Sequence, residues 1–570
     1  MKKQLNIPCR ALAVLLAVSF ANVAFAANFW WTGKDSRAYG SAGNWSSSNN
    51  GSTVATKIPG SDAVRFMAKN GSTSVFSDRF INDGYIVEFD KAYTTGYQLF
   101  FNTDSAKVIF SGTGENASLT YTRSGYSTGA VMGIGDTTDS YLRIQDMVYT
   151  HSYTNLVLGW TAANKGGLEI ASDAKLVVPT DAIFHKGVFI KRGYILVDGG
   201  EIDAPNSIIS IAMRDANDKA ANSSVIGAFT NLNGKVTCNQ LIVGAADTTN
   251  NRDNYGEYYQ NGGSLATSGN IVIAQGNRAR SSGKFILNGG KVTTAAKVYV
   301  GDSGLNCTTG TAYLVVNYGE IGCKELHIGK QSQGIVDING GTVICTNECY
   351  FGWKTAYADT DAGRAQMAQD AVMHPQLNLL GGVLQTPKMY SASTNTYSTV
   401  FFNGGTLREG FDNANLIENS ARLYVKVGEK GGTIDTAGVT AKLHKTIQTG
   451  VDEGTDGGMT FTGGGTLALQ SSASLSYTGD TRVTSDTTFT IPTKNKVNLD
   501  KFVCIADTKP ANEGHAILTI TGSETFSKDD LARVRIADGN YPAASVRLKL
   551  SGDGKSILCK NHKGLIISFH

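Results

Sequence analysis

The sequence predicts an all-β protein built as a parallel β-solenoid, and three observations support this prediction. Short glycine turns recur along the chain: LNGGKVTTAAKVYVG at residues 287–301 has counterparts in LNGKVTCNQLIVG, VNYGEIGCKELHIG and INGGTVICTNECYFG. The aligned turn glycines lie as close as 22 residues apart, from Gly319 to Gly341. Apolar and polar residues alternate after each turn, as they do in strands. A repeat of this length with extra segments at its corners is typical of solenoid coils.

The first 26 residues have the features of a secretory signal peptide. Lys2, Lys3 and Arg10 form a basic start, ALAVLLAVSF is an apolar stretch, and Ala24-Phe25-Ala26 resembles a cleavage site. The apolar stretch is too short for a stable membrane anchor, and no later one is longer. We therefore expect an exported protein with no transmembrane segment in the mature chain, located at the cell surface, associated with the outer membrane, or extracellular.

Composition and charge exclude other classes of protein. The chain has 66 glycines without a three-residue period, which excludes collagen. The signal peptide contains three of the 51 basic residues and none of the 48 acidic ones, so the mature chain has no net charge. Nucleic-acid-binding proteins normally carry a basic surplus, so we expect no nucleic-acid partner.

Residues 27–130 are expected to form an N-terminal aromatic cap and the first irregular coils. Trp30, Trp31 and Trp45 are predicted to cover the open end of the stack. The regular coils follow, with insertions at their corners, and the composition of residues 360–375 predicts a short helix in one insertion.

The repeat predicts which residues point inward. Apolar residues stand two positions after the turn glycine at Val236, Leu265, Val292, Ile321 and Val343. A second strand in each coil carries the inward pairs Leu241/Val243, Ile271/Ile273, Val298/Val300 and Leu326/Ile328. Because alternate strand residues share a face, these positions predict continuous buried columns.

Asparagine recurs two residues before the turn glycine. Asparagine accepts left-handed backbone and can hydrogen-bond to its counterpart about 4.8 Å along the stack. We therefore predict a structural ladder formed by Asn261, Asn288, Asn317, Asn339 and Asn403.

The segment 431–495 carries a family resemblance. GGGTLALQ followed by YTGDTRV, together with the N-terminal WTG and GNW and the NGG coils, resembles the autotransporter-associated β-strand repeat of bacterial surface passengers. The resemblance implies a right-handed parallel β-helix that is exported and displayed, often in adhesion. Residues 496–570 are too few for the translocator barrel of that family, so a small C-terminal β cap is expected instead. The expected divisions are 1–26, 27–130, 131–410, 411–495 and 496–570.

A polysaccharide lyase or glycoside hydrolase of the β-helix class is the alternative. Catalysis in a groove needs carboxylates from neighbouring coils. Asn102-Thr103-Asp104 and Asp529-Asp530 are too far apart in the sequence, and we identify no acidic positions stacked in successive coils. We therefore predict no catalytic residue, cofactor or metal site. A groove with three or more converging acidic and basic side chains from adjacent coils would favour the enzyme.

Aromatic residues are the remaining candidates for ligand contact. Tyr255, Tyr258, Tyr259, Trp160 and Trp353 lie in or beside polar insertions. Exposed rings stack on sugars, whereas buried rings fill corners, and both interpretations stay open. The predicted function is non-catalytic, namely adhesion or contact with surface glycans, matrix or other surface proteins.

Cysteines also fall on the inward phase. Cys323 and Cys345 belong to consecutive coils, so their Cα atoms are expected about 4.8 Å apart. Side chains stacked in register point the same way, which disfavours the disulfide torsion. A buried, unbonded pair is therefore the favoured prediction and a disulfide the alternative.

Overall fold

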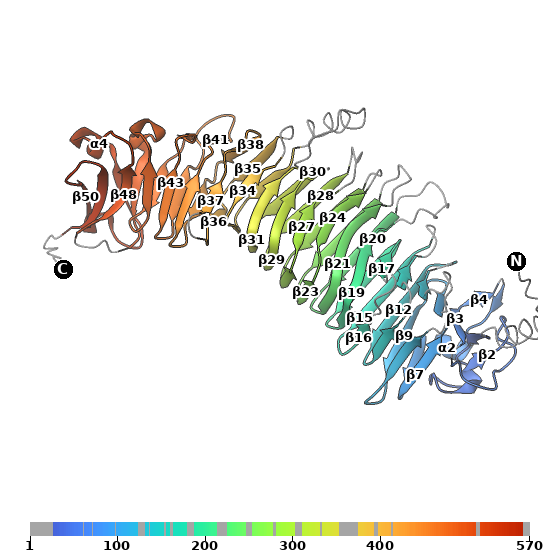
Figure 1. Cartoon of the computed structure of the whole chain (residues 1–570). Helices are drawn as coiled ribbons and strands as arrows, with labels where there is room; N and C mark the ends of the chain where they lie inside the picture. The colour runs from blue at the N-terminus through green and yellow to red at the C-terminus, as the bar shows by residue number, and fades with distance from the viewer. Residues whose placement is uncertain are drawn as a thin grey trace, which may run out of the picture.

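The computed structural model is an elongated, curved stack of coils, with the N-terminal strands at one end of the stack and the C-terminal strands at the other (Figure 1). It describes residues 27–562 except for 61, 71, 97–98, 123–131, 136, 153–155, 160–163, 179–186, 214–224, 247–253, 277–280, 303–309, 331–332, 353–373, 393–396, 412–413 and 509–512.

The coils place their strands in three rows that run along the stack. The first row is a sheet of fifteen strands, all parallel: β6 (Ile86–Phe89), β9 (Lys107–Gly112), β12 (Ser140–Gln145), β15 (Gly166–Ala171), β18 (Gly193–Asp198), β20 (Val225–Asn231), β22 (Asn254–Gln260), β25 (Ser281–Leu287), β28 (Thr311–Val316), β30 (Gln333–Ile338), β32 (Gln376–Leu379), β35 (Ser398–Phe402), β38 (Leu423–Val427), β41 (Ile447–Thr449) and β44 (Leu475–Ser476).

The second row contains β7 (Ala92–Gly96), β10 (Ser118–Thr122), β13 (Val148–His151), β16 (Lys175–Val177), β19 (Glu201–Ile211), β21 (Lys235–Ala246), β23 (Ser264–Thr267), β26 (Lys291–Thr294), β29 (Glu320–Ile328), β31 (Thr342–Phe351), β33 (Val383–Gln385), β36 (Thr406–Arg408), β39 (Gly432–Asp435), β42 (Met459–Thr462), β45 (Thr481–Thr484), β47 (Phe502–Ala506) and β49 (Arg535–Asp538).

The third row contains β1 (Asn28–Trp31), β3 (Ala63–Met67), β8 (Leu99–Asn102), β11 (Met132–Ile134), β14 (Leu156–Leu158), β17 (Gly187–Ile190), β24 (Ile271–Gly276), β27 (Lys297–Val300), β34 (Met389–Ser391), β37 (Ala414–Ile417), β40 (Thr440–Leu443), β43 (Thr466–Leu469), β46 (Thr488–Ile491) and β48 (His515–Ile520). Strands β19, β21, β29 and β31 continue from the second row into the third, so the two rows form one hydrogen-bonded sheet. The parallel β-helix predicted from the sequence is confirmed.

The inward columns follow the predicted register. Val236, Leu265, Val292, Ile321 and Val343 are partners in consecutive coils, and all are buried. The pairs from Leu241/Val243 to Leu326/Ile328 align in the same way and are equally buried. Each coil therefore contributes apolar side chains to one continuous core, and the removal of these side chains from water stabilises the stack.

The turn glycines let successive coils approach closely. Gly290 has φ +78°, and a Cβ on it would lie 2.4 Å from the carbonyl oxygen of Gly263 in the preceding coil. Gly319 has φ +84° and a Cβ there would lie 2.5 Å from the Gly290 oxygen. Only glycine tolerates both the left-handed backbone and this contact, so the NGG turn stacks on itself.

The N-terminal end is closed by aromatic rings. Trp31 and Trp45 are buried with ring centroids 4.9 Å apart in an edge-to-face arrangement, and Tyr39 stacks on Phe89 at 4.8 Å. Trp30 is only half-buried, because it alternates with Trp31 on β1. Two of the three tryptophans expected in the cap therefore lie in its core.

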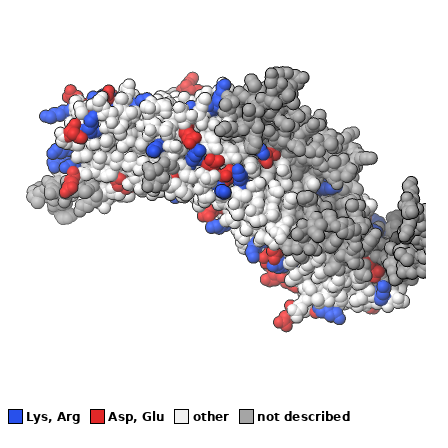
Figure 2. Space-filling view, viewed as in Figure 1, with Lys and Arg blue, Asp and Glu red and all other residues white. Residues whose placement is uncertain are grey.

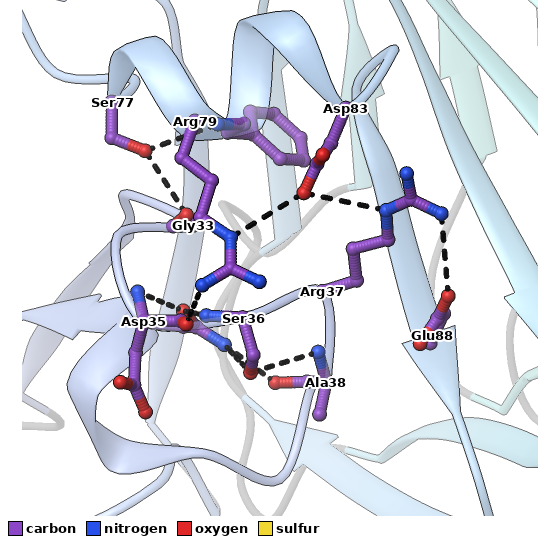
Figure 3. Close-up of polar contacts among 11 residues, drawn as sticks. Gly33, Asp35, Ser36, Arg37, Ala38, Ser77, Arg79, Asp83 and Glu88 are labelled. Carbon is purple, nitrogen blue, oxygen red and sulfur yellow. Dashed lines mark hydrogen bonds and ion pairs between the residues drawn. The ribbon is translucent and has the colours of Figure 1, made fainter.

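Polar contacts hold this cap together (Figure 3). Ser77 caps helix α2 (Asp78–Asn82), and its hydroxyl donates to the carbonyl oxygen of Gly33 at 3.0 Å. Arg37 lies 3.4 Å from Asp83 at the C-terminal end of the helix and 3.7 Å from Glu88 on β6. The helix is thus tied both to the N-terminal loop and to the first row. The cap also contains the 3-10 turn η1 (Ala42–Asn44) and the short strands β2 (Trp45–Ser46), β4 (Lys69–Asn70) and β5 (Thr73–Ser74).

The YTGD turn of the last coils is organised by a buried carboxylate. Asp456 accepts hydrogen bonds from the backbone N–H groups of Thr478 at 2.7 Å, Gly479 at 2.8 Å and Gly458 at 2.9 Å. Burial opposes its ionisation, but these three donors hold the pKa of Asp456 below its ordinary value. This part of the motif therefore has a structural role.

The C-terminal end departs from the parallel pattern. Strands β50 (Val546–Leu550) and β51 (Ser556–Asn561) form an antiparallel hairpin, and β51 pairs antiparallel with β48. Helix α4 (Lys528–Arg533) and the 3-10 turns η2 (Lys494–Lys496), η3 (Leu499–Lys501) and η4 (Ala543–Ser545) complete this region.

The described cysteines are buried and unbonded. Cys323 and Cys345 are register partners, and their Sγ atoms lie 3.6 Å apart. Cys238 pairs in register with Thr267, so it has no cysteine neighbour in the next coil. The favoured prediction of an unbonded pair agrees with this arrangement.

Candidate contact surfaces

A tyrosine cluster lies on the outward face of β22 in the first row. Tyr255 is 37% exposed, and its hydroxyl donates to Glu257 Oε1 at 2.6 Å. Tyr259 is half-buried and donates to Glu257 Oε2 at 2.9 Å. Burial and the neighbouring carboxylate both raise the pKa of each phenol, so both rings stay neutral. One carboxylate thus holds two rings in place.

Tyr258 lies elsewhere, and its assignment as a sugar-contacting residue is wrong. Its ring is fully buried and stacks between Phe229 at 5.1 Å and Phe285 at 4.7 Å. Its hydroxyl donates to Gln260 Oε1 at 2.7 Å inside the core. Successive residues of a strand point to opposite faces, so Tyr258 points into the core while Tyr255 and Tyr259 point outward. Trp160 and Trp353 lie outside the described residues.

Four of the five predicted ladder asparagines are joined. The Nδ2 of Asn288, Asn317 and Asn339 each donates at 2.8 Å to the Oδ1 of the asparagine one coil earlier, starting from Asn261. Asn403 is separate, because Leu380 occupies the corresponding corner of the intervening coil. Its Oδ1 instead accepts from the backbone N–H of Lys430 at 2.9 Å. Each linked amide is therefore hydrogen-bonded to an amide of a neighbouring coil, so the ladder has a structural role.

A second aromatic cluster lies towards the N-terminal end of the first row. Tyr141 and Tyr194 stack with centroids 6.0 Å apart across Gly167, which lies between them in the register. A Cβ on Gly167 would meet both rings at 2.5–2.7 Å, so glycine is required for the rings to close over it. The Tyr194 hydroxyl donates to Glu169 at 3.0 Å.

Glu169 is the centre of a closed charge network. Lys107 lies 2.5 Å and Arg143 3.3 Å from its two carboxylate oxygens. Burial opposes ionisation, yet hydrogen bonds from Lys107, Tyr194 and Arg143 hold the pKa of Glu169 below its ordinary value. The carboxylate is therefore charged and fully engaged by its neighbours.

A charged column runs along the start of the third row, at outward-pointing strand positions of consecutive coils, and Glu325 within it is buried. Lys297 lies 2.6 Å from Glu325, Lys388 lies 3.9 Å from Glu348, and Lys388 also lies 3.3 Å from Glu418. Glu325 and Glu348 are direct register partners. The expectation that no acidic positions stack in successive coils is therefore wrong. We call these five residues the charged column.

An aromatic column runs beside the charged column. Its rings follow one another as Tyr299, His327, Tyr350 and Tyr390, with centroid separations of 5.4, 4.0 and 5.6 Å. His327 is fully buried, and its Nε2 lies 2.6 Å from the carbonyl oxygen of Gly352. Burial lowers the pKa of His327 to about 3, so the imidazole is neutral and donates to that oxygen. The buried ring acts as a packing element between two tyrosines.

A shallow hollow of about 490 Å³ crosses the turns that precede the second row. Lys175, Glu201 and Lys235 line it, with Lys175 and Lys235 at 3.5 and 2.8 Å from Glu201. Acidic and basic side chains likewise lie next to each other over the visible surface, without a large area of one sign (Figure 2). The hollow is polar, and both of its lysines are paired with Glu201.

Within the part of the chain that the structure describes, no three His, Cys, Asp or Glu side chains are grouped as ligands for a metal ion. Over the same residues, no helix combines the length and the apolar character needed to cross a bilayer.

Comparisons with family models, with curated proteins and with solved structures return no match to this chain.

Proposed function

We propose that this chain is an exported, non-catalytic β-helix passenger that contacts glycans or other surface proteins, as an adhesin does. The observation that carries the proposal is the first row, where Tyr141, Tyr194, Tyr255, Tyr259 and Tyr313 present partly exposed rings on the outward face of one parallel sheet. Aromatic side chains of this kind combine a large contact area with little conformational freedom to lose on binding.

Fractionation of the producing cells tests the export part of the proposal. Mass spectrometry should find the chain, starting after Ala26, in the secreted, washed-cell or outer-membrane fraction. The purified mature chain should also bind to glycan-coated or cell-coated surfaces. Retention of the uncleaved chain inside the cell, together with no surface binding, would refute the proposal.

A polysaccharide-active enzyme is the second candidate, and the charged column favours it. Glu325 and Glu348 are register partners in adjacent coils, and a glycosidase needs two carboxylates brought together in this way from neighbouring coils. Against catalysis, each of the two is engaged by a lysine, and the adjacent His327 is buried and neutral. We therefore rank this candidate second.

Incubation with pectin, alginate and chondroitin separates the two candidates. The passenger should produce no new reducing ends and no unsaturated products. Turnover that is abolished by Glu325→Gln or Glu348→Gln, and retained by Glu320→Gln, would establish the enzyme. Glu320 is a matched control, because it pairs with Lys291 at 2.9 Å on the outside of the neighbouring row.

A further inference from the structure

Two cysteine side chains meet inside the C-terminal end of the stack. Cys504 lies on β47, the second-row strand of a parallel coil, and Cys559 lies on β51 of the antiparallel hairpin. Both side chains are fully buried in the same apolar core. Their thiols are hydrogen-bonded to each other. The contact therefore joins the last parallel coils to the hairpin that closes them.

The strand pairing shows that these two cysteines are not stacked in register. Cys504 is the register partner of Ile536 on β49, in a parallel pair of strands. Cys559 lies opposite His515 on β48, in an antiparallel pair. The two thiols thus reach each other from strands in different pairings that run in different directions.

The pair Cys323 and Cys345 provides a contrast within the same chain. These two residues are register partners on neighbouring parallel strands, with their Sγ atoms 3.6 Å apart. Their side chains leave the strands in the same direction, which disfavours the torsion that a disulfide requires. Cys504 and Cys559 are free of this constraint, because they are not register partners.

The hydrogen bond makes the two thiols chemically unequal. It lowers the pKa of Cys559 below its ordinary value, although burial opposes the change. The same hydrogen bond, together with burial, raises the pKa of Cys504. Since the thiolate is the form that attacks a disulfide, Cys559 is the better nucleophile of the pair.

From this arrangement we infer that Cys504 and Cys559 become joined by a disulfide in the exported protein, through exchange with an oxidising disulfide of a small thiol or a thiol oxidase. The Cys559 thiolate attacks one sulfur of the oxidant and releases the first thiolate, which leaves a mixed disulfide on Cys559. Cys504 then loses its proton and attacks the Cys559 sulfur, which releases the second thiolate. The chain gives up two protons and two electrons, and the oxidant is reduced to two thiols.

The inference rests on the export part of the proposed function, because an oxidising compartment supplies the disulfide. Both sulfurs are fully buried once the cap is closed. Exchange with an external disulfide therefore takes place before β51 docks against β48. The finished bond closes a long loop and fixes the hairpin on the stack, where burial shelters the bond from reductants.

Refolding of the purified, denatured mature chain in a mixture of reduced and oxidised glutathione tests the inference. Free thiols are then alkylated, the chain is digested without reductant, and the peptides are identified by mass spectrometry. A peptide pair that links Cys504 to Cys559 is expected. Cys323 and Cys345 should both be alkylated in the same digest, so the chain contains its own control for non-specific oxidation.

Hydrogen exchange measures what the bond does to the cap. The amides of β50 and β51 should exchange at least about tenfold more slowly in the oxidised chain than in the chain refolded with dithiothreitol. Cys504→Ala/Cys559→Ala should abolish this difference. Cys238→Ala is the matched control, because it removes a buried cysteine whose register partner is Thr267, and it should retain the difference. The comparison of the two redox states of the parent needs no substitution, so it decides even where a variant fails to fold.

The outcomes also separate this inference from the proposed function. Alkylation of both Cys504 and Cys559 after refolding with oxidised glutathione, in a chain that circular dichroism shows to be folded, would overturn the disulfide. A chain recovered from the cell surface that binds glycan-coated surfaces, but has both thiols free, refutes the disulfide and leaves the proposed function intact. A chain retained inside the cell with both thiols free and no surface binding refutes both.

Discussion

Replacing Glu409 by Gln should change how the stability of the β-helix depends on pH. Glu409 is fully buried after β36, and its Oε1 accepts from the backbone N–H groups of Gly410 and Phe411, each at 2.9 Å. Its Oε2 has no hydrogen-bond partner within the described part of the chain. Burial raises the pKa of Glu409 from its ordinary 4.5 to about 7, although the two backbone donors oppose the change.

The sign follows from proton binding. Between pH 4.5 and about 7 the folded state holds a proton on Glu409 that the unfolded chain has released, so stability falls as pH rises through that window. Above pH 7 Glu409 is ionised in both the folded and the unfolded state, so its effect on the free energy of unfolding no longer changes with pH. The difference between the two pKa values corresponds to at most about 3 kcal/mol. Glu409→Gln keeps the shape and stays neutral, so relative to the parent it should gain about 2–3 kcal/mol between pH 4.5 and pH 8.

Because each coil contacts only its neighbours, the change in stability is best measured in the coils next to Glu409. Hydrogen exchange of the β36 and β39 amides should show the parent losing protection from pH 4.5 to pH 8 relative to the variant, after correction for the intrinsic exchange rate. Glu429→Gln, an exposed position in the next coil, should leave the difference at zero. Parallel pH curves for the parent and Glu409→Gln would show that the carboxyl is solvated in the folded state and would refute the reasoning.

Three further predictions concern the turns, the ladder and the thiols. Ala274 has φ +59°, so Ala274→Gly should stabilise the fold by about 1 kcal/mol and raise the denaturant midpoint. Gly244 lies at the same corner one coil earlier, and Gly244→Ala should lower the midpoint, because the new Cβ would lie 2.2 Å from a carbonyl oxygen. A lower midpoint for Ala274→Gly would contradict this prediction. Asn288→Leu removes two links of the ladder and should cost about 1–2 kcal/mol in chemical denaturation, and an unchanged midpoint would mean that the links contribute nothing. Cys323 and Cys345 should both be alkylated after denaturation without reductant, and a tryptic peptide linking them would prove the unbonded pair wrong.

The core was predictable because its signal is strictly periodic, and the outward residues were harder for physical reasons. Tyr258 stands five residues before its turn glycine, as do the buried Phe229 and Phe285, so coil alignment reveals its inward phase. The polar Asn254 and Gln260, buried on the same face, obscure that phase when β22 is considered alone.

The charged column was missed because its register is irregular. Glu325 stands six residues after its turn glycine and Glu348 seven, and the register between β29 and β31 shifts between Cys323 and Glu325. Such a bulge removes the constant offset on which sequence alignment depends.

The antiparallel hairpin of β50 and β51 has a consequence for assembly. A stack of parallel coils ends in a row of unpaired backbone groups that could accept the first coil of another copy and grow into a fibre. At the C-terminal end, β48 is paired with a strand of the opposite direction, so a parallel coil cannot continue from it. At the other end, the buried rings of Trp31, Tyr39 and Trp45 close the core with an irregular cap in place of a regular coil. The described ends therefore disfavour head-to-tail polymerisation, and removing β50 and β51 should turn discrete rods into filaments visible by electron microscopy.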